Sequence, residues 1–335
     1  MDRLQYIDTL KGWAILSVVL LHFEIGVFPG WLNAWISFYM ITAFYFTSGW
    51  LEGIKCREMT VSQLVKKRWQ SLGKPYIYFS ILILLFDIIL LAIGHYDLKF
   101  IAREIYKTIS LRGIGTLWFL PALFGGEVIF RYLLNKRSFL WVVVALTITL
   151  VYLHYYYYWT TYYRGISEVH QMFDAPFFAI QKMLYAWPII GIAYVISKKF
   201  NSKLMEMKPL FVLLIGIGVT AISVYVCGGF CPFSFGDFSP LIVPVIGPFG
   251  LLMLAYPMKK GIIVKFLSFW GVNSLVMMVT HYSILLVIYQ ILDEAIFHAP
   301  FSGIRTLVWF IITVITEYPI VWFFNHKAKW MLGKS

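Results

Sequence analysis

The sequence is poor in charged residues, since Asp, Glu, Lys and Arg make up 13% of its 335 residues. Soluble globular domains carry about 25%, so this scarcity argues against a soluble fold. Cysteine is also scarce, with three residues, and no zinc-site spacing is present, so we predict no metal. Cys227 and Cys231 flank a short predicted outer loop, where they either form a disulfide or remain two free thiols.

Several catalytic motifs are missing as well. The sequence has no P-loop and no G-x-S-x-G, and the glycine pairs at 113–115 and 216–218 lack the third glycine of G-x-G-x-x-G. A nucleotide-driven pump and a soluble-type serine hydrolase are therefore unsupported. The net charge of +12 does not indicate a nucleic-acid partner, because the charges cluster in short segments between apolar runs, as membrane topology requires.

Long apolar runs dominate what is present. Hydrophobic residues make up 60% of the chain, the mean hydropathy is +0.77, and runs of about 20 residues are long enough to cross a bilayer. We predict an all-α polytopic helical bundle in the cytoplasmic membrane, one domain over 1–335. The first run is a retained helix, because a second apolar run follows at once. About ten transmembrane helices are expected, at 11–29, 33–52, 75–95, 115–134, 138–157, 178–197, 209–227, 239–257, 271–292 and 303–325.

The distribution of Lys and Arg predicts the orientation of these helices. With the N-terminus inside, 21 of the 28 Lys and Arg residues fall in inner segments, six in outer segments, and Lys182 within a span. Both termini are therefore predicted to be cytosolic. Residues 58–74 and 97–112 look amphipathic and are expected to lie on the inner and outer surfaces.

Lys11 and His22 are the most informative residues of the first apolar run. Ten residues separate them, which returns both side chains to nearly the same helix face, about 16 Å apart along the axis. Ionisable side chains in a membrane are costly and usually functional. An ammonium can bind phosphate, and an imidazole can take a proton from a hydroxyl and return it. Asp8 is placed to pair with Lys11 across one turn.

Other ionisable residues in or beside the predicted spans remain open between a functional role and pairing between helices. The basic run Lys66, Lys67 and Arg68 either cradles an anion at the inner mouth of a cavity or forms an ordinary charged interface. The remaining candidates are Glu24, Asp87, Glu127, Lys182, His281 and Glu317.

Four segments in order resemble acyltransferase family 3, a family of membrane proteins. They are YIDTLKG at 6–12 followed by His22, FYFTSGW at 44–50, the basic run ending in KPY at 74–76, and LWFLPALF at 117–124. The last is closest to the sugar O-acetylase-like branch, and NSLVMMVTH at 273–281 is similar to the family's late Ser-rich helix. Lys11 departs from the family, where Arg is commoner; Lys keeps the charge but loses bidentate phosphate contacts.

The resemblance implies an O-acyltransferase that moves an acetyl or other acyl group from acetyl-CoA to a sugar hydroxyl of a surface polysaccharide, glycolipid or precursor. It implies donor binding by Lys11, Lys66, Lys67, Arg68 and Trp118. His22 is the expected general base, with Glu24 or His281 orienting it or sharing its proton. No metal cofactor and no nucleic acid are expected; the partners are the carbohydrate acceptor and the lipid bilayer.

Two other functions fit buried charges in a helical bundle. A transporter or flippase for a lipid-linked sugar would need no thioester, and a scaffold without chemistry would tolerate replacement of His22. The sequence leaves the acceptor sugar, the acyl group and the oligomeric state open. It also leaves open whether a covalent acyl-enzyme forms, with Ser48, Ser274 and Thr280 as candidate carriers.

Overall fold

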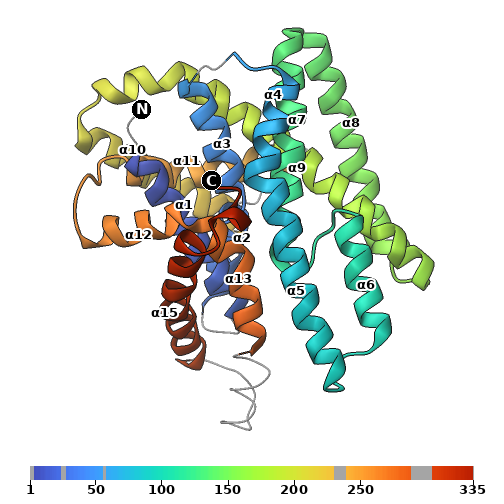
Figure 1. The fold of residues 1–335 in the computed structure, drawn as a ribbon. Coiled ribbons are helices and arrows are strands. Elements are labelled where there is room, and N and C mark those ends of the chain that lie inside the picture. Colours follow the sequence, from blue (N-terminus) through green and yellow to red (C-terminus); the bar gives the residue numbers. More distant parts are fainter. Residues whose placement is uncertain (1–3, 24–27, 56–57, 230–238, 288–303, 335) are drawn as a thin grey trace. The chain divides into compact units, whose positions relative to one another are not determined.

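The structure, a computed structural model, describes all residues except 1–3, 24–27, 56–57, 230–238, 288–303 and 335, and no side chains of 23, 239–242, 285–287 and 304. The described residues form helices joined by short connections (Figure 1), which confirms the all-α prediction. They divide into two compact units, unit 1 (Met1–Arg57 and Ile189–Phe323) and unit 2 (Glu58–Pro188 and Phe324–Ser335). The 39-residue helix α9 (Glu168–Glu206) contributes to both.

Unit 1 contains α1 (Gln5–Phe23), α2 (Gly30–Tyr39), α3 (Thr42–Lys55), α10 (Pro209–Cys227), α11 (Ser239–Ala255), α12 (Ile262–Val272), α13 (Ser274–Val287) and most of α15 (Ile304–His326). Two segments predicted as single helices are broken. The segment 33–52 is divided between α2 and α3. The segment 271–292 includes the last two residues of α12 and then α13, and α13 is bent by 81° against α12.

The bend between α12 and α13 has a local cause at Asn273. The backbone N–H and the side-chain amide of Asn273 both donate to the Phe269 carbonyl, at 3.1 and 2.9 Å. Its own carbonyl accepts the N–H of Met277, in the first turn of α13. Asparagine competes in this way with continued helix, so α12 ends and α13 leaves in a new direction, as Figure 1 shows.

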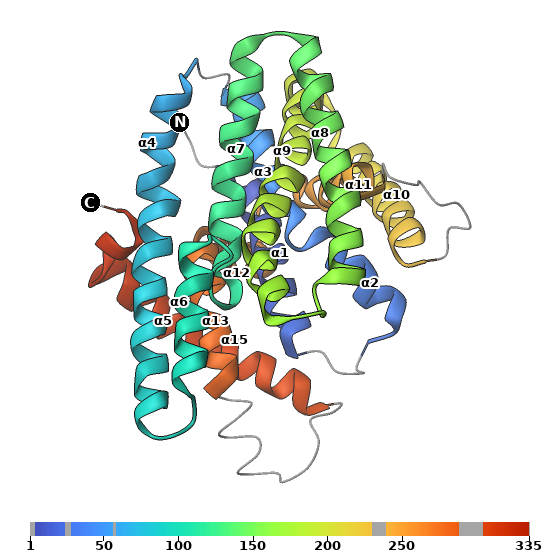
Figure 2. The ribbon, with the colours of Figure 1, turned by 90° about the vertical axis from the view of Figure 1, so that its right-hand side faces the viewer.

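Unit 2 contains α4 (Val61–Arg68), the π-helical turn η1 (Trp69–Gly73), α5 (Lys74–Ala92), α6 (Leu98–Ile109), the 3₁₀ turn η2 (Gly115–Trp118), α7 (Phe119–Lys136), α8 (Phe139–Tyr158), the π-helical turn η3 (Trp159–Tyr163) and the 3₁₀ turn η6 (Lys329–Leu332). Thr60 begins α4 with a reciprocal capping box to Gln63. The predicted surface segment 58–74 is not separate, because α4, η1 and α5 form one helical stretch, Val61–Ala92. Figure 2 shows α7 and α8 side by side, joined by a short turn at Arg137.

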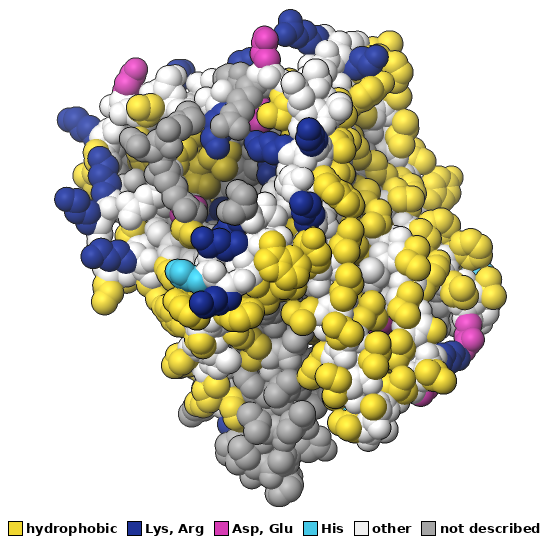
Figure 3. Space-filling view, viewed as in Figure 1, with side chains coloured by type: hydrophobic (Ala, Val, Ile, Leu, Met, Phe, Trp, Pro, Cys, Tyr) yellow, Lys and Arg dark blue, Asp and Glu magenta, His cyan; other side chains and the backbone are white. Residues whose placement is uncertain are grey.

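Six helices among the described residues are long and apolar enough to cross a membrane. They are Val61–Ala92, Gly115–Lys136, Phe139–Tyr163, Glu168–Glu206, Pro209–Cys227 and Arg305–His326. The bent pair of α12 and α13 makes a seventh if it is one span. Hydrophobic side chains cover the face over α5 and α8 in Figure 3, as expected of helices that face lipid. The ten spans and the cytosolic termini stay predictions.

Candidate active site

His22 and His281 come together in unit 1, although 258 residues separate them in the sequence. His22 lies in the last turn of α1 and His281 in the second turn of α13. Their ring centroids are 5.1 Å apart in an edge-to-face arrangement. The centroid of the Tyr282 ring lies 5.9 Å from that of His22. The His22 side chain is exposed, whereas His281 is fully buried. The His22 imidazole is therefore accessible to a reactant, and the buried His281 ring packs against it.

The hydrogen bonds of the two rings fix which nitrogen is basic. His22 Nδ1 lies 2.7 Å from the Val18 carbonyl oxygen, and His281 Nδ1 lies 2.5 Å from that of Met277. A carbonyl only accepts, so each Nδ1 carries the hydrogen and each neutral ring keeps its lone pair on Nε2. Among the described residues, His281 Nε2 is buried without a hydrogen-bond partner. His22 thus has a proton-accepting nitrogen on an exposed ring.

A second polar contact links α13 to α15 beside His281. The Thr280 hydroxyl lies 2.8 and 3.0 Å from the two carboxyl oxygens of Glu317, and 2.8 Å from the Val276 carbonyl. Glu317 is fully buried. Burying a carboxyl group is costly unless it is hydrogen-bonded, so Thr280 stabilises Glu317 where α15 packs on α13. The Thr280 hydroxyl is committed to these contacts, which makes it a poor acyl carrier.

The helix that carries His22 is held by a close crossing with α12. A Cβ atom on Gly12 would lie 1.8 Å from the Leu267 carbonyl oxygen, and one on Gly271 would lie 1.8 Å from that of Asp8. The Thr9 and Ser268 hydroxyls are 3.1 Å apart at the same crossing. Small residues allow such contact between membrane helices. Lys11, half-buried, precedes Gly12, so the crossing fixes the part of α1 that carries this cation.

In unit 2 the basic run on α4 divides into two kinds of side chain. Lys66 and Lys67 are exposed, whereas Arg68 forms an ion pair with Glu127 of α7, with Nη2 2.6 Å from Oε1. Glu127 is buried, and a buried carboxylate needs a partner of this kind. Arg68 therefore joins α4 to α7. This role could not be assigned from local patterns, because the two residues lie 59 positions apart in the sequence.

Trp118 lies in a separate group of cations and aromatic rings in unit 2. The Lys182 ammonium lies 5.1 Å from the Trp118 centroid and 5.0 Å from that of Phe178, and the Arg112 guanidinium lies 4.6 Å from Phe178. These distances are typical of cation–π contacts. All four side chains are half-buried, so each keeps an accessible surface.

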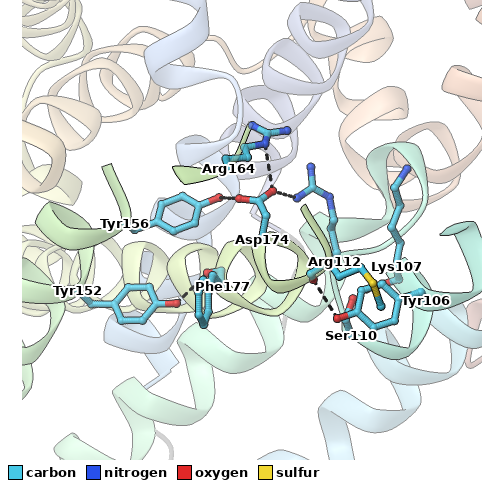
Figure 4. A network of polar contacts seen from close by, with 10 residues as sticks. Tyr106, Lys107, Ser110, Arg112, Tyr152, Tyr156, Arg164, Asp174 and Phe177 are labelled. Carbon is cyan, nitrogen blue, oxygen red and sulfur yellow. Dashed lines mark hydrogen bonds and ion pairs between the residues drawn. The ribbon is translucent and has the colours of Figure 1, made fainter. Parts of the chain in front are cut away.

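Asp174 forms an ion pair with Arg112, one member of this group. Figure 4 shows its carboxylate between Arg112 and Arg164, whose nitrogens lie 2.6 and 3.4 Å away, while the Tyr156 hydroxyl donates to it at 3.2 Å. Asp174 is buried, and three donors compensate for the loss of water around it. Lys182 was a candidate from its place in a predicted span, whereas Arg112, Asp174 and Arg164 were not, because the partners in these ion pairs are distant in sequence.

A family model described as an acyltransferase domain matches residues 4–325. The chain belongs to acyltransferase family 3. The match spans both units and confirms the family named from the sequence; together with the apolar helices it identifies a multi-pass membrane acyltransferase. No curated protein matches the chain, and no solved structure matches it.

The predicted site residues of this acyltransferase are placed as follows. His22, His281 and Lys11 belong to unit 1, while Lys66, Lys67, Arg68 and Trp118 belong to unit 2. Glu24 and Cys231 lie outside the described residues, and Cys227 is a buried thiol 3.9 Å from the Ser223 hydroxyl. Among the described residues no group of three His, Cys, Asp or Glu side chains is arranged to hold a metal ion.

Proposed function

We propose that this membrane acyltransferase moves an acetyl or other short acyl group from cytosolic acyl-CoA to a hydroxyl group of a cell-surface polysaccharide, glycolipid or precursor. The observation that carries the proposal is the pairing of His22 with His281. It gives an exposed imidazole whose Nε2 keeps its lone pair, at the end of a helix that also carries Lys11. Such a ring suits general-base catalysis on a hydroxyl.

In the proposed reaction, His22 Nε2 accepts the proton of the acceptor hydroxyl as its oxygen attacks the thioester carbonyl. The carbon–sulfur bond then breaks, an ester forms, and the departing CoA thiolate takes the proton from His22. Atoms and charge balance without a metal or an oxidant. His281 is a positioning residue, since its buried ring packs on that of His22 and holds its orientation. Glu24 stays a candidate for a second group that orients His22 or shares its proton.

The donor carries phosphates, and ammonium and guanidinium groups bind phosphate. We assign Lys11, Lys66 and Lys67 to the donor phosphates. Arg68 is included through its position on α4, although its guanidinium is also held by Glu127. The distance of about 16 Å between Lys11 and His22 along α1 is suitable for a pantetheine arm.

The test is acetyl-CoA binding and its slow hydrolysis by the purified full chain in detergent. His22→Gln should bind acetyl-CoA but lose about 10²- to 10⁴-fold in turnover, the usual contribution of a general base. His154→Gln is the control, because His154 is exposed on α8 in unit 2. Unchanged turnover in a folded His22→Gln would contradict the assignment of the base.

Lys11→Ala should weaken acetyl-CoA binding by about tenfold, the loss of one charge-assisted contact to phosphate, and Lys11→Arg should retain binding. Lys265→Ala, an exposed lysine of α12, is the matched control. If folded wild-type protein bound neither acetyl-CoA nor other acyl-CoAs, the donor assignment would be wrong, and transport of a lipid-linked sugar would become the leading function.

A further inference from the structure

Lys182 is an unusual charge for a helix that is apolar enough to span a membrane. It lies within α9, half-buried, and its ammonium contacts the faces of Trp118 and Phe178. Among the described residues of unit 2, no carboxylate forms an ion pair with it. An ammonium has three N–H donors and cannot accept, and aromatic faces satisfy it only by electrostatic attraction. Its donors remain available to an anion.

The charges around Lys182 do not balance. Arg112 and Lys182 share the Phe178 ring, so the two cations lie within about 10 Å of each other, where like charges still repel. Arg164 adds a third positive charge, and Asp174 is the one carboxylate of this group. Nearby in unit 2, Glu168 pairs with Lys99, and Glu104 pairs with Arg103 and Lys107, so neither acid offsets these cations. An anionic ligand would relieve the excess positive charge.

Trp118 also lies apart from the other residues assigned to the donor in unit 2. Nine positions along the chain separate it from Glu127, the partner of Arg68. Along a helix that distance is about 13 Å. The half-buried Trp118 and Phe178 rings lie edge to face beside the cations, with centroids 5.8 Å apart. Aromatic rings of this kind are suited to the C–H face of a sugar ring.

We propose that Lys182, Arg112, Trp118 and Phe178 form a subsite for an anionic carbohydrate, with a phosphate or carboxylate of the acceptor on Lys182 and a sugar ring on Trp118. This proposal rests on the proposed function, and it moves Trp118 from the donor to the acceptor. Asp174, held by Arg112, Arg164 and Tyr156, is a positioning residue that fixes Arg112 beside Phe178.

The proposal is tested by titrating the purified full chain in detergent with glucose 1-phosphate, glucuronate and neutral methyl glucoside, following tryptophan fluorescence and calorimetry. Wild type should bind at least one anionic sugar about tenfold more tightly than the neutral one, the gain of one charge-assisted hydrogen bond. Comparing the phosphate with the carboxylate shows which anion the subsite takes. Inorganic phosphate alone should bind more weakly than glucose 1-phosphate, because it lacks the ring that rests on Trp118.

The matched variants are Lys182→Gln and Lys198→Gln. Lys198 lies on the same helix and also contacts an aromatic face, that of Tyr194 at 5.7 Å. Lys182→Gln should abolish the preference for the anionic sugar, and Lys198→Gln should keep it. Equal affinities for charged and neutral sugars in wild type, or an unchanged preference in folded Lys182→Gln, would overturn the proposal.

CoA titrated into the same proteins separates this proposal from the proposed function. Loss of CoA binding in Lys182→Gln, with sugar binding unchanged, would assign the cations to the donor and overturn the acceptor subsite. A wild type that binds the anionic sugar but no acyl-CoA would contradict the donor assignment and leave the subsite standing.

Discussion

At the scale of single residues, Thr280 and His281 are neighbours on α13 whose side chains have different partners. His281 packs on His22, whereas Thr280 bonds Glu317 of α15. The contact to Glu317 is a stability element, because removing one partner leaves a buried polar group unsatisfied.

Thr280→Val should therefore lower the free energy of unfolding by about 1–3 kcal/mol, measured as a fall in melting temperature in detergent. Thr280→Ser should lower the free energy of unfolding much less, since serine keeps the hydroxyl group. Thr316→Val is the control, because the Thr316 hydroxyl donates to the Ile312 carbonyl of its own helix. Equal melting temperatures for Thr280→Val and Thr316→Val would show that Glu317 does not depend on Thr280.

Residue patterns alone predicted some residues of the site but not their contacts, and the family resemblance named His281 as a residue that orients His22 or shares its proton. The spacing of Lys11 and His22 follows from helix geometry, and His281 was listed as an ionisable residue of a predicted span. The meeting of His22 with His281, of Arg68 with Glu127 and of Arg112 with Asp174 depends on how distant helices pack, which local periodicity does not encode.

At the scale of elements, the crossing of α1 with α12 has no room for added atoms. The nearest neighbours of a Cβ on Gly12 are backbone atoms of Leu267, which cannot move as a side chain does. Gly12→Ala should force the helices apart and cost about 1–3 kcal/mol, as overpacking does, and displacement of Lys11 should weaken acetyl-CoA binding as well.

Gly218→Ala on α10 is the matched control, because a Cβ there meets no atom within 4 Å. It should be neutral or stabilise the helix by up to about 1 kcal/mol, since alanine is the better helix former. Melting temperatures of the two variants in the same detergent check both expectations. A Gly12→Ala protein as stable as Gly218→Ala would mean that α1 and α12 are not in backbone contact.

Hydropathy predicted helices better than it predicted their breaks. The segments predicted at 75–95, 138–157 and 209–227 correspond closely to α5, α8 and α10. The break near Met40 was missed, and so was the helix α12 before the bend at Asn273, because a window of apolar residues measures composition and not direction. The joining of α4 to α5 was missed because the polar residues of α4 look like the end of a span.

At the scale of the molecule, the charges of unit 2 indicate which end faces the cytosol. The start of α4 and the end of α7 lie together, since the Asn135 amide donates to the Met59 carbonyl at 3.2 Å and Arg137 lies 3.9 Å from Glu58. This end carries the exposed Lys66, Lys67, Lys136 and Arg137. At the starts of α6 and α9, by contrast, Lys99 is paired with Glu168.

The positive-inside rule predicts that the first of these ends faces the cytosol. Helix α8 connects the two ends, with Ser138 before it and Gly165 after η3. Single cysteines at these positions, in a background with the three native cysteines changed to serine, report the orientation. An impermeant maleimide applied to intact cells should label Gly165→Cys, where a Cβ meets open space, and should label Ser138→Cys only after the membrane is permeabilised.

Labelling of Ser138→Cys alone in intact cells would reverse the orientation and place the cations of α4 on the side away from cytosolic acyl-CoA. Equal labelling of both cysteines would show that α8 does not cross the membrane.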